Sequence, residues 1–131
     1  MRSRRRLGLV GGLGSAFLIV SVAIAGGLGD KFAEESARGD FAIANAAGSA
    51  RNVDSLYVKV QSKPHQRVDG AYAVTCSKGT GAGSKSGNIR GQTTLKKKLK
   101  MPYDQADDCV ASASAQLADG GKVVVKLFVK H

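Results

Sequence analysis

The two cysteines of this chain are placed where they could form a disulfide bond. Cys76 ends the alternating run Ala71–Cys76, and Cys109 opens a second alternating run, Cys109–Leu117. Because alternate residues of a strand point to one face, both sulfurs fall on an expected buried face. We predict a Cys76–Cys109 disulfide that ties the two sheets of a small β core together, with two free buried thiols as the alternative. A link that closes a loop of about 34 residues is worth roughly 4 kcal/mol in the chain-entropy model.

Closely spaced basic residues form a second group that could bind a partner. Lys96, Lys98 and Lys100 alternate along an expected strand, so they would share one face at a spacing of about 7 Å. Such a row could contact a cell-envelope polyanion, an anionic lipid or another exported protein, while a solvated strand edge is the alternative. With the basic residues of the preceding segment, the expected contact residues are Lys78, Lys85, Arg90, Lys96, Lys98 and Lys100. No specific nucleic-acid binding is expected, because the aromatic residues do not interleave with the lysines as base stacking requires.

A glycine-rich stretch is similar to a nucleotide-binding motif without matching it. Gly79–Ser86 approaches the phosphate-binding loop, but Ser84 stands where that motif requires glycine. The motif also needs a following helix and a parallel sheet, and neither is expected here. We therefore expect residues 77–90 to form a flexible loop that could bind an anion through its backbone amides.

The remaining polar residues give little support for catalysis or metal binding. Asp104, Asp107 and Asp108 could coordinate a cation, although three acids in a short turn are more typical of a solvated corner. His65 lies beside a proline and His131 is the last residue, so neither is grouped with a nucleophile. We expect no catalytic site, no metal and no cofactor, and we predict that the protein is not an enzyme.

The N-terminal residues have the three parts of an export signal. Arg2 and Arg4–Arg6 precede the apolar run 7–25, which ends in the small residues Ala23-Ile24-Ala25. Cleavage after Ala25 is one outcome. The other is an uncleaved anchor, since residues 7–29 carry no charge and are long enough to span a bilayer. We expect a protein that is secreted, or anchored by an N-terminal helix to the outer face of the cytoplasmic membrane. Both the Sec route and the twin-arginine route remain open.

Charge and periodicity describe the rest of the chain. Without the four N-terminal arginines, 16 basic and 10 acidic residues remain, a net charge of +6. Residues 26–52 are rich in Ala, Gly and Ser, and we expect a tether with a short helix over Asp30–Arg38 that ends at Gly39. From Val53 the apolar residues recur with a period of two. The expected strands are 53–61, 71–76, 92–101, 109–117 and 122–130, with a hairpin turn at Ala118–Gly121.

These strands predict an all-β fold, a small antiparallel immunoglobulin-like β-sandwich over residues 53–131. Cysteines on the second and next-to-last strands resemble the inter-sheet disulfide of immunoglobulin-like domains. The chain lacks the core Trp of those domains, and Tyr103 stands six residues before Cys109 rather than two. The resemblance therefore implies an architecture and no function.

A second resemblance covers Val58–Val129. The sequence Val74-Thr75-Cys76-Ser77-Lys78-Gly79, the loop Gly83–Gly87 and the Gly120-Gly121 turn resemble small exported single-disulfide β-sandwich proteins of actinobacteria, which have no assigned activity. This resemblance implies a fold and a compartment but supplies no catalytic residue. We expect an exported, non-catalytic binding or structural module of the bacterial envelope or extracellular space. The alternative is a secreted cationic effector that binds membranes or anionic polymers.

Overall fold

The computed structural model describes residues 29–131, and all of its regular structure is β-strand. The strands are β1 (Asp30–Gly39), β2 (Ile43–Val53), β3 (Ser55–Lys63), β4 (Arg67–Lys78), β5 (Gly81–Gln92), β6 (Leu95–Lys98), β7 (Ala106–Leu117) and β8 (Gly121–Lys130). Within the described range there is no helix of the length and apolarity needed to cross a membrane. The signal or anchor expected over residues 1–25 lies outside the described residues.

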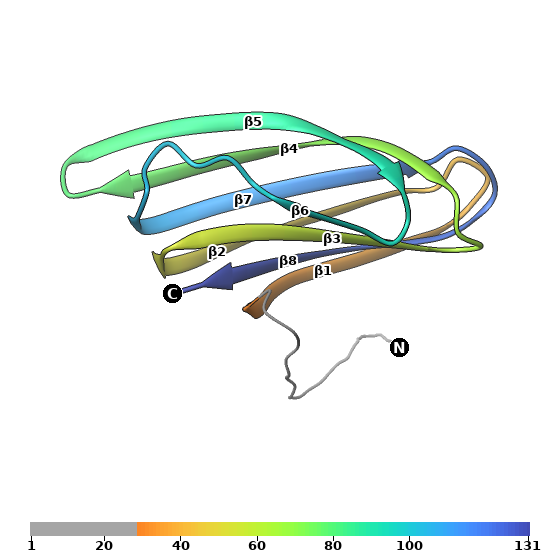
Figure 1. The fold of residues 1–131 in the computed structure, drawn as a ribbon, viewed down its shortest axis with the longest axis horizontal. Coiled ribbons are helices and arrows are strands. Elements are labelled where there is room, and N and C mark those ends of the chain that lie inside the picture. The colour runs from red at the N-terminus through yellow and green to blue at the C-terminus, as the bar shows by residue number, and fades with distance from the viewer. Residues whose placement is uncertain (1–28) are drawn as a thin grey trace. The chain divides into compact units, whose positions relative to one another are not determined.

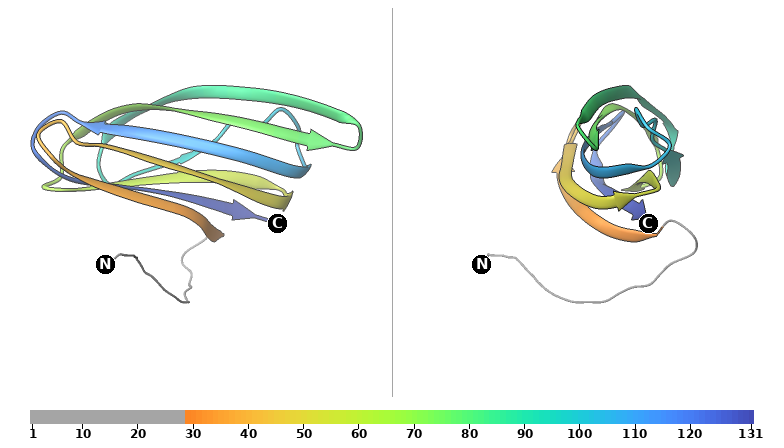
Figure 2. Two further views of the ribbon diagram at one scale, coloured as in Figure 1. Left: turned by 180° about the vertical axis from the view of Figure 1, so that it is seen from behind. Right: turned by 90° about the vertical axis from the view of Figure 1, so that its left-hand side faces the viewer.

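The strands form two antiparallel sheets that face each other across one core (Figure 1). Sheet 1 has the order β1-β8-β3-β6, and sheet 2 has the order β2-β7-β4-β5. The end-on view in Figure 2 shows both sheets curving around the core. Successive strands alternate between the sheets except at the β4–β5 hairpin. The first strand lies beside the last and so on inwards, giving the pairs β1–β8, β2–β7, β3–β6 and β4–β5, and the pairs are joined by β8–β3 in one sheet and β7–β4 in the other. Eight antiparallel strands connected in this order form a jelly roll.

The expected immunoglobulin-like connectivity is therefore wrong, although the two-layer sandwich is present. Immunoglobulin sheets contain several pairs of consecutive strands side by side, whereas β4–β5 is the single such pair among residues 29–131. The turn at Ala118–Gly121 illustrates the cause. We expected a hairpin there, but the chain passes from β7 in sheet 2 to β8 in sheet 1. Its glycines allow a tight reversal, and they do not specify which strand becomes the hydrogen-bonded neighbour.

The core is built from the alternation that the sequence shows. Inward-facing aliphatic side chains of β3 and β8 are fully or nearly fully buried: Leu56, Val58, Val60, Val123, Val125, Leu127 and Val129. Sheet 2 opposes them with small residues of β7, which are Ala111, Ala113 and Ala115. Small side chains opposite large ones allow two sheets to interdigitate closely.

Residues 30–53 form part of the sandwich, contrary to the expected tether and short helix. Asp30–Gly39 is β1 at the edge of sheet 1, and Ile43–Val53 is β2 at the edge of sheet 2. Ala44, Ala46 and Ala50 of β2 point into the core. Alanine and serine have weak strand preferences, so pairing with β8 and β7 decides the conformation here rather than local propensity.

Residues 77–90, expected to be a flexible loop, instead form most of a long hairpin. β5 is paired with β4 along its whole length, from Lys78↔Gly81 to Arg67↔Gln92. Ile89 of β5 is fully buried, while other inward positions of β5 are glycines because neighbouring side chains occupy the space. A Cβ at Gly83 would lie 2.9 Å from Pro102 Cβ, and one at Gly87 would lie 2.6 Å from the Tyr72 hydroxyl. The glycines that suggested a loop thus serve close packing.

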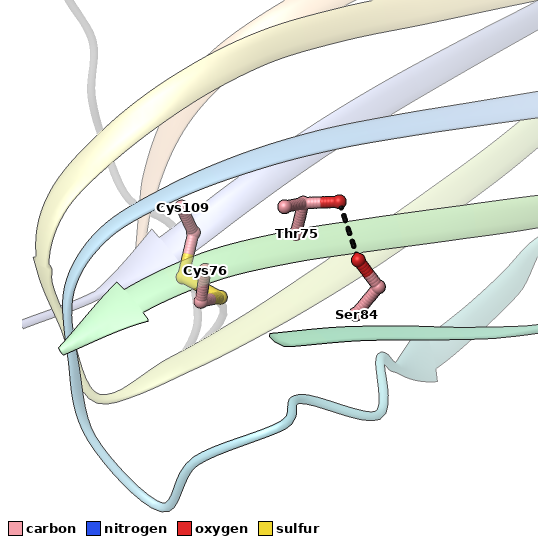
Figure 3. The surroundings of a disulfide bond; sticks show 4 residues. All are labelled: Thr75, Cys76, Ser84 and Cys109. Atoms are coloured by element: carbon pink, nitrogen blue, oxygen red, sulfur yellow. Dashed lines mark hydrogen bonds between the residues drawn. A yellow bond between two sulfur atoms is a disulfide. The ribbon is translucent and has the colours of Figure 1, made fainter. Parts of the chain in front are cut away.

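The predicted disulfide is present, but it does not join the two sheets. Cys76 and Cys109 form an S–S bond, and they are directly opposite each other on the neighbouring strands β4 and β7 of sheet 2 (Figure 3). Their Cα atoms are 4.1 Å apart. Both side chains are buried, as the alternation predicted. The wrong part of the prediction was the sheet assignment, since the two strands belong to one sheet.

Candidate functional site

The outward face of sheet 1 carries most of the lysines of the described residues. On β3 and β8 the inward positions are aliphatic, so the intervening residues point outward. Lys96 and Lys98 of β6 belong to the same face, because they are paired with outward residues of β3. We call this surface the lysine face, defined by Lys59, Lys63, Lys96, Lys98, Lys122, Lys126 and Lys130.

Like charges lie directly opposite one another across the lysine face. Lys59 of β3 is paired with Lys126 of β8 on one side and with Lys96 of β6 on the other. Lys63 is likewise paired with Lys122. Directly opposed residues have Cβ atoms about 5 Å apart, and like charges at this separation destabilise a sheet. The row Lys126–Lys59–Lys96 therefore costs folding stability when no anion is bound.

Two aromatic residues lie within the same face. Tyr57 is paired with Phe128 on β8 and with Lys98 on β6, one position along the face from the three-lysine row. The Lys130 ammonium is 5.3 Å from the centre of the Tyr57 ring, a cation–π contact. We expected the aromatic residues not to interleave with the lysines, and for Tyr57 this was wrong, because cross-strand pairing brings it beside them. The Phe128 side chain is buried.

The environment of Lys126 combines burial with nearby charges of both signs. Burial lowers the pKa of its ammonium below the ordinary value, and the charges of Lys31 and Lys59 lower it further. Glu34 of β1 acts in the opposite direction, but it also forms an ion pair with Lys31. A bound anion would favour the charged form of Lys126 and offset the repulsion within the row.

The structure separates the contact residues that the sequence suggested. Lys96 and Lys98 belong to the lysine face, and Lys100 follows the end of β6 as an exposed residue. Lys78 and Lys85 are exposed on sheet 2, in the other layer from the lysine row. Arg90 is also on sheet 2, where its Nε atom lies 2.9 Å from a carboxylate oxygen of Asp69. The six residues thus do not form one site.

Sequence reasoning missed the lysines of β3 and β8, although a signal for them exists. Lys59 and Lys63 alternate with the buried residues of β3, and Lys122, Lys126 and Lys130 do the same on β8. The alternation alone therefore indicates that the outward-facing residues of each strand include several lysines. What the sequence could not supply is the order β8-β3-β6, which sets these residues side by side.

An open pocket of about 290 Å³ lies at one end of the sandwich. It is lined in part by Asp54, Lys78, Asp107 and His131. Asp107 accepts a hydrogen bond from the Gly79 amide at 2.7 Å, and Asp54 accepts one from the Gln105 side chain at 3.3 Å. These carboxylates tie neighbouring segments together. Among residues 29–131 no three His, Cys, Asp or Glu side chains are grouped so that they could hold a metal ion.

The lysine face is thus the feature of the described chain best suited to binding: a charged, solvent-facing array on a rigid sheet. It can attract and hold a multiply charged anion, with Tyr57 offering a partly exposed ring beside the charges. Comparison with known proteins adds no partner, since neither the protein-family models nor the curated proteins include a match to this chain.

Proposed function

We propose that this protein is an exported, non-catalytic binding module of the bacterial envelope or extracellular space, and that its lysine face binds an anionic polymer. The observation that supports this most directly is the Lys126–Lys59–Lys96 row. A sheet that served only as a scaffold would be more stable with opposite charges or neutral residues at these positions. Like charges that are kept side by side despite their repulsion are typical of a surface that binds a ligand of opposite charge.

Export is the second part of the proposal and is supported by the sequence alone. The basic and apolar parts of residues 1–25 are typical of a signal or anchor. A disulfide in a domain this small fits an oxidising compartment. Polymers with repeated negative charges are the partners that a lysine array would meet there.

A variant that removes the row tests the binding surface. We expect Lys59→Gln/Lys96→Gln/Lys126→Gln to weaken binding to inorganic polyphosphate by about 10- to 100-fold, since each exposed charge pair contributes roughly 0.5–1 kcal/mol. The matched control is Lys78→Gln/Lys85→Gln/Arg90→Gln, which removes the same charge from sheet 2 and should bind within about threefold of the unaltered protein. Fluorescence anisotropy at low salt measures both affinities. Equal loss in the two variants, or no loss in the first, would show that the lysine face is not the binding surface.

A secreted cationic effector is the second candidate, and the partly exposed Tyr57 within the lysine face favours it. An aromatic ring beside lysines resembles the amphipathic surfaces that bind anionic bilayers. Release of an encapsulated dye from vesicles rich in phosphatidylglycerol separates the two functions. A binding module binds without releasing dye, whereas an effector releases it at concentrations where binding saturates.

A further inference from the structure

The outer side of β5 is a free sheet edge. β5 is the last strand of sheet 2, and β4 is its only strand neighbour among residues 29–131 (Figure 1). Successive residues of a strand direct their backbone N–H and C=O groups to opposite sides. The Thr93 amide, which follows β5, donates to the Gln66 carbonyl, so the odd-numbered residues of β5 point to β4. The even-numbered residues from Ala82 to Asn88 therefore point away from β4, towards the free edge.

The disulfide gives the same assignment independently. The Cα separation of 4.1 Å between Cys76 and Cys109 is typical of a cross-strand pair that exchanges no backbone hydrogen bonds. Cys76 therefore directs its backbone groups to the other side, where its partner is Gly83 of β5. Ser84 follows Gly83, so its N–H and C=O point to the free edge. The position is well defined, because the Ser84 hydroxyl is hydrogen-bonded to Thr75 (Figure 3).

The other sheet edges are short or lie against a neighbouring strand. β6 has only 4 residues. On the opposite side of the sandwich β2 lies against β1, because a Cβ atom at Gly48 would be 3.1 Å from the Phe32 carbonyl oxygen. β5 has 12 residues, contains no proline and is paired with β4 without a bulge over its whole length. Short strands, bulges and prolines commonly protect a sheet edge against added strands, and β5 has none of these.

Lys85 places a positive charge beside this edge. Val74, its partner on β4, is fully buried, whereas Lys85 itself is exposed, so it lies on the inward side of β5 but reaches solvent. Its nearest neighbours on that side of β5 are Gly83 and Gly87, which have no side chain to shield it. β5 carries no acidic residue, and within the described part of the chain Lys85 forms no ion pair. The edge thus combines free backbone groups with a free cation.

We infer that the edge of β5 binds an extended acidic peptide, which joins sheet 2 as an additional strand. Backbone hydrogen bonds to the even-numbered residues hold the peptide, as is usual for strand addition. A carboxylate opposite Lys85 forms a cross-strand ion pair, whereas a lysine there is repelled. A second copy of this chain fits less well, because two β5 strands paired antiparallel about their centre would place both Lys85 side chains close together on one face.

Two substitutions at one position separate backbone binding from side-chain binding. Both Ser84→Pro and Ser84→Ala lose the hydroxyl that bonds to Thr75. Only Ser84→Pro also loses the outward N–H, which takes no part in pairing with β4. Fluorescence anisotropy measures binding of the labelled peptide Thr-Glu-Thr-Glu-Thr-Glu-Thr. We expect Ser84→Pro to weaken binding at least about tenfold and Ser84→Ala to bind within about threefold of the unaltered protein.

A change of charge at Lys85 tests why the peptide is acidic. Lys85→Glu should weaken binding of the glutamate peptide by about tenfold or more and strengthen binding of the corresponding peptide with lysines in place of glutamates. Because Lys85 is exposed, this variant should fold normally. Unchanged affinity for both peptides would show that Lys85 does not select the partner.

Amide hydrogen exchange locates the peptide without any substitution. The Ser84 and Ser86 amides should exchange rapidly in the free protein and at least about tenfold more slowly when the glutamate peptide is saturating. The Lys59→Gln/Lys96→Gln/Lys126→Gln variant should bind this peptide within about threefold of the unaltered protein. Loss of polymer binding and loss of peptide binding are therefore separate outcomes, and the inference does not depend on the function proposed above.

Three results would overturn the inference. The first is no saturable binding of the glutamate peptide up to about 1 mM. The second is equal affinity of folded Ser84→Pro and Ser84→Ala. The third is binding that leaves exchange at Ser84 and Ser86 unchanged and is lost in the three-lysine variant, which would place the peptide on the lysine face. If Ser84→Pro melts early, Ser86→Pro and Ser86→Ala provide the same comparison.

Discussion

Lys126 is a single residue whose partial burial gives stability a defined pH dependence. Its pKa is below the ordinary value of 10.5, mainly because of burial and further because of Lys31 and Lys59. Between the lowered pKa and 10.5 the unfolded chain holds more protons than the folded chain, so this residue makes stability rise with pH there. Below that window the full destabilisation is present.

We therefore expect Lys126→Met to be more stable than the unaltered protein near pH 7, by less than about 1 kcal/mol because the ammonium is partly exposed. The advantage should shrink as the pH rises towards the ordinary lysine pKa. Urea unfolding at about pH 7 and about pH 10 measures both effects. Lys98→Met, at an exposed position of the same face, is the control. A Lys126 variant that is less stable than this control at neutral pH would contradict the assignment.

At the level of strands, the close contact between β4 and β7 leaves no space at Gly70. A Cβ atom there would lie 1.8 Å from the Ser114 carbonyl oxygen and 2.9 Å from the Ala115 Cα. Both are backbone atoms, so neither can move without displacing β7. We expect Gly70→Ala to lower the free energy of unfolding by about 3 kcal/mol or more.

Thermal unfolding compares this variant with Ala71→Ser, an exposed change at the next residue that should cost less than about 0.5 kcal/mol. Gly87→Ala should fall between them, because its added methyl meets the Tyr72 side chain rather than backbone. Equal stability of Gly70→Ala and Ala71→Ser would mean that β4 and β7 are not in this register.

The strands also show which parts of the fold the sequence could predict. Alternation predicted the buried faces of β3, β4, β7 and β8, because apolar residues recur there with period two, large ones on β3 and β8 and mainly alanines on β7. It failed for β1, β2 and β5, which are rich in alanine, glycine and serine and bury few large side chains, such as Val53 of β2 and Ile89 of β5. A strand with so few large apolar residues carries a weak periodic signal. Its conformation is set by the strands it pairs with.

Across the whole molecule, the two sheets have opposite surface chemistry. One presents lysines and the other presents small neutral residues, although both alternate with the same kind of apolar core. The sequence could show that Lys59, Lys96 and Lys126 point outward from their own strands. Their meeting in one row depends on jelly-roll connectivity, which is a property of long-range pairing. The candidate site was therefore only partly predictable, through Lys96 and Lys98.

This division of roles gives a prediction for the disulfide, which lies wholly within sheet 2 (Figure 3). Cys76→Ala/Cys109→Ala should lower stability by about 3–4 kcal/mol, because the bond closes a long loop in the unfolded chain. In a domain of this size the melting temperature should fall by roughly 15–25 °C. Below the new melting temperature polyphosphate affinity should be unchanged, because the lysine face belongs to the other sheet.

The control removes a weaker link at the same place. Thr75 and Ser84 share one exposed hydrogen bond of 2.9 Å beside the disulfide (Figure 3), so Thr75→Ala should cost less than about 1 kcal/mol. If the double cysteine variant melts no lower than Thr75→Ala, the disulfide contributes little to folding. If it stays folded but no longer binds polyphosphate, the two sheets are coupled. Polyphosphate binding by the lysine face of sheet 1 would then depend on the geometry of sheet 2, which the disulfide maintains.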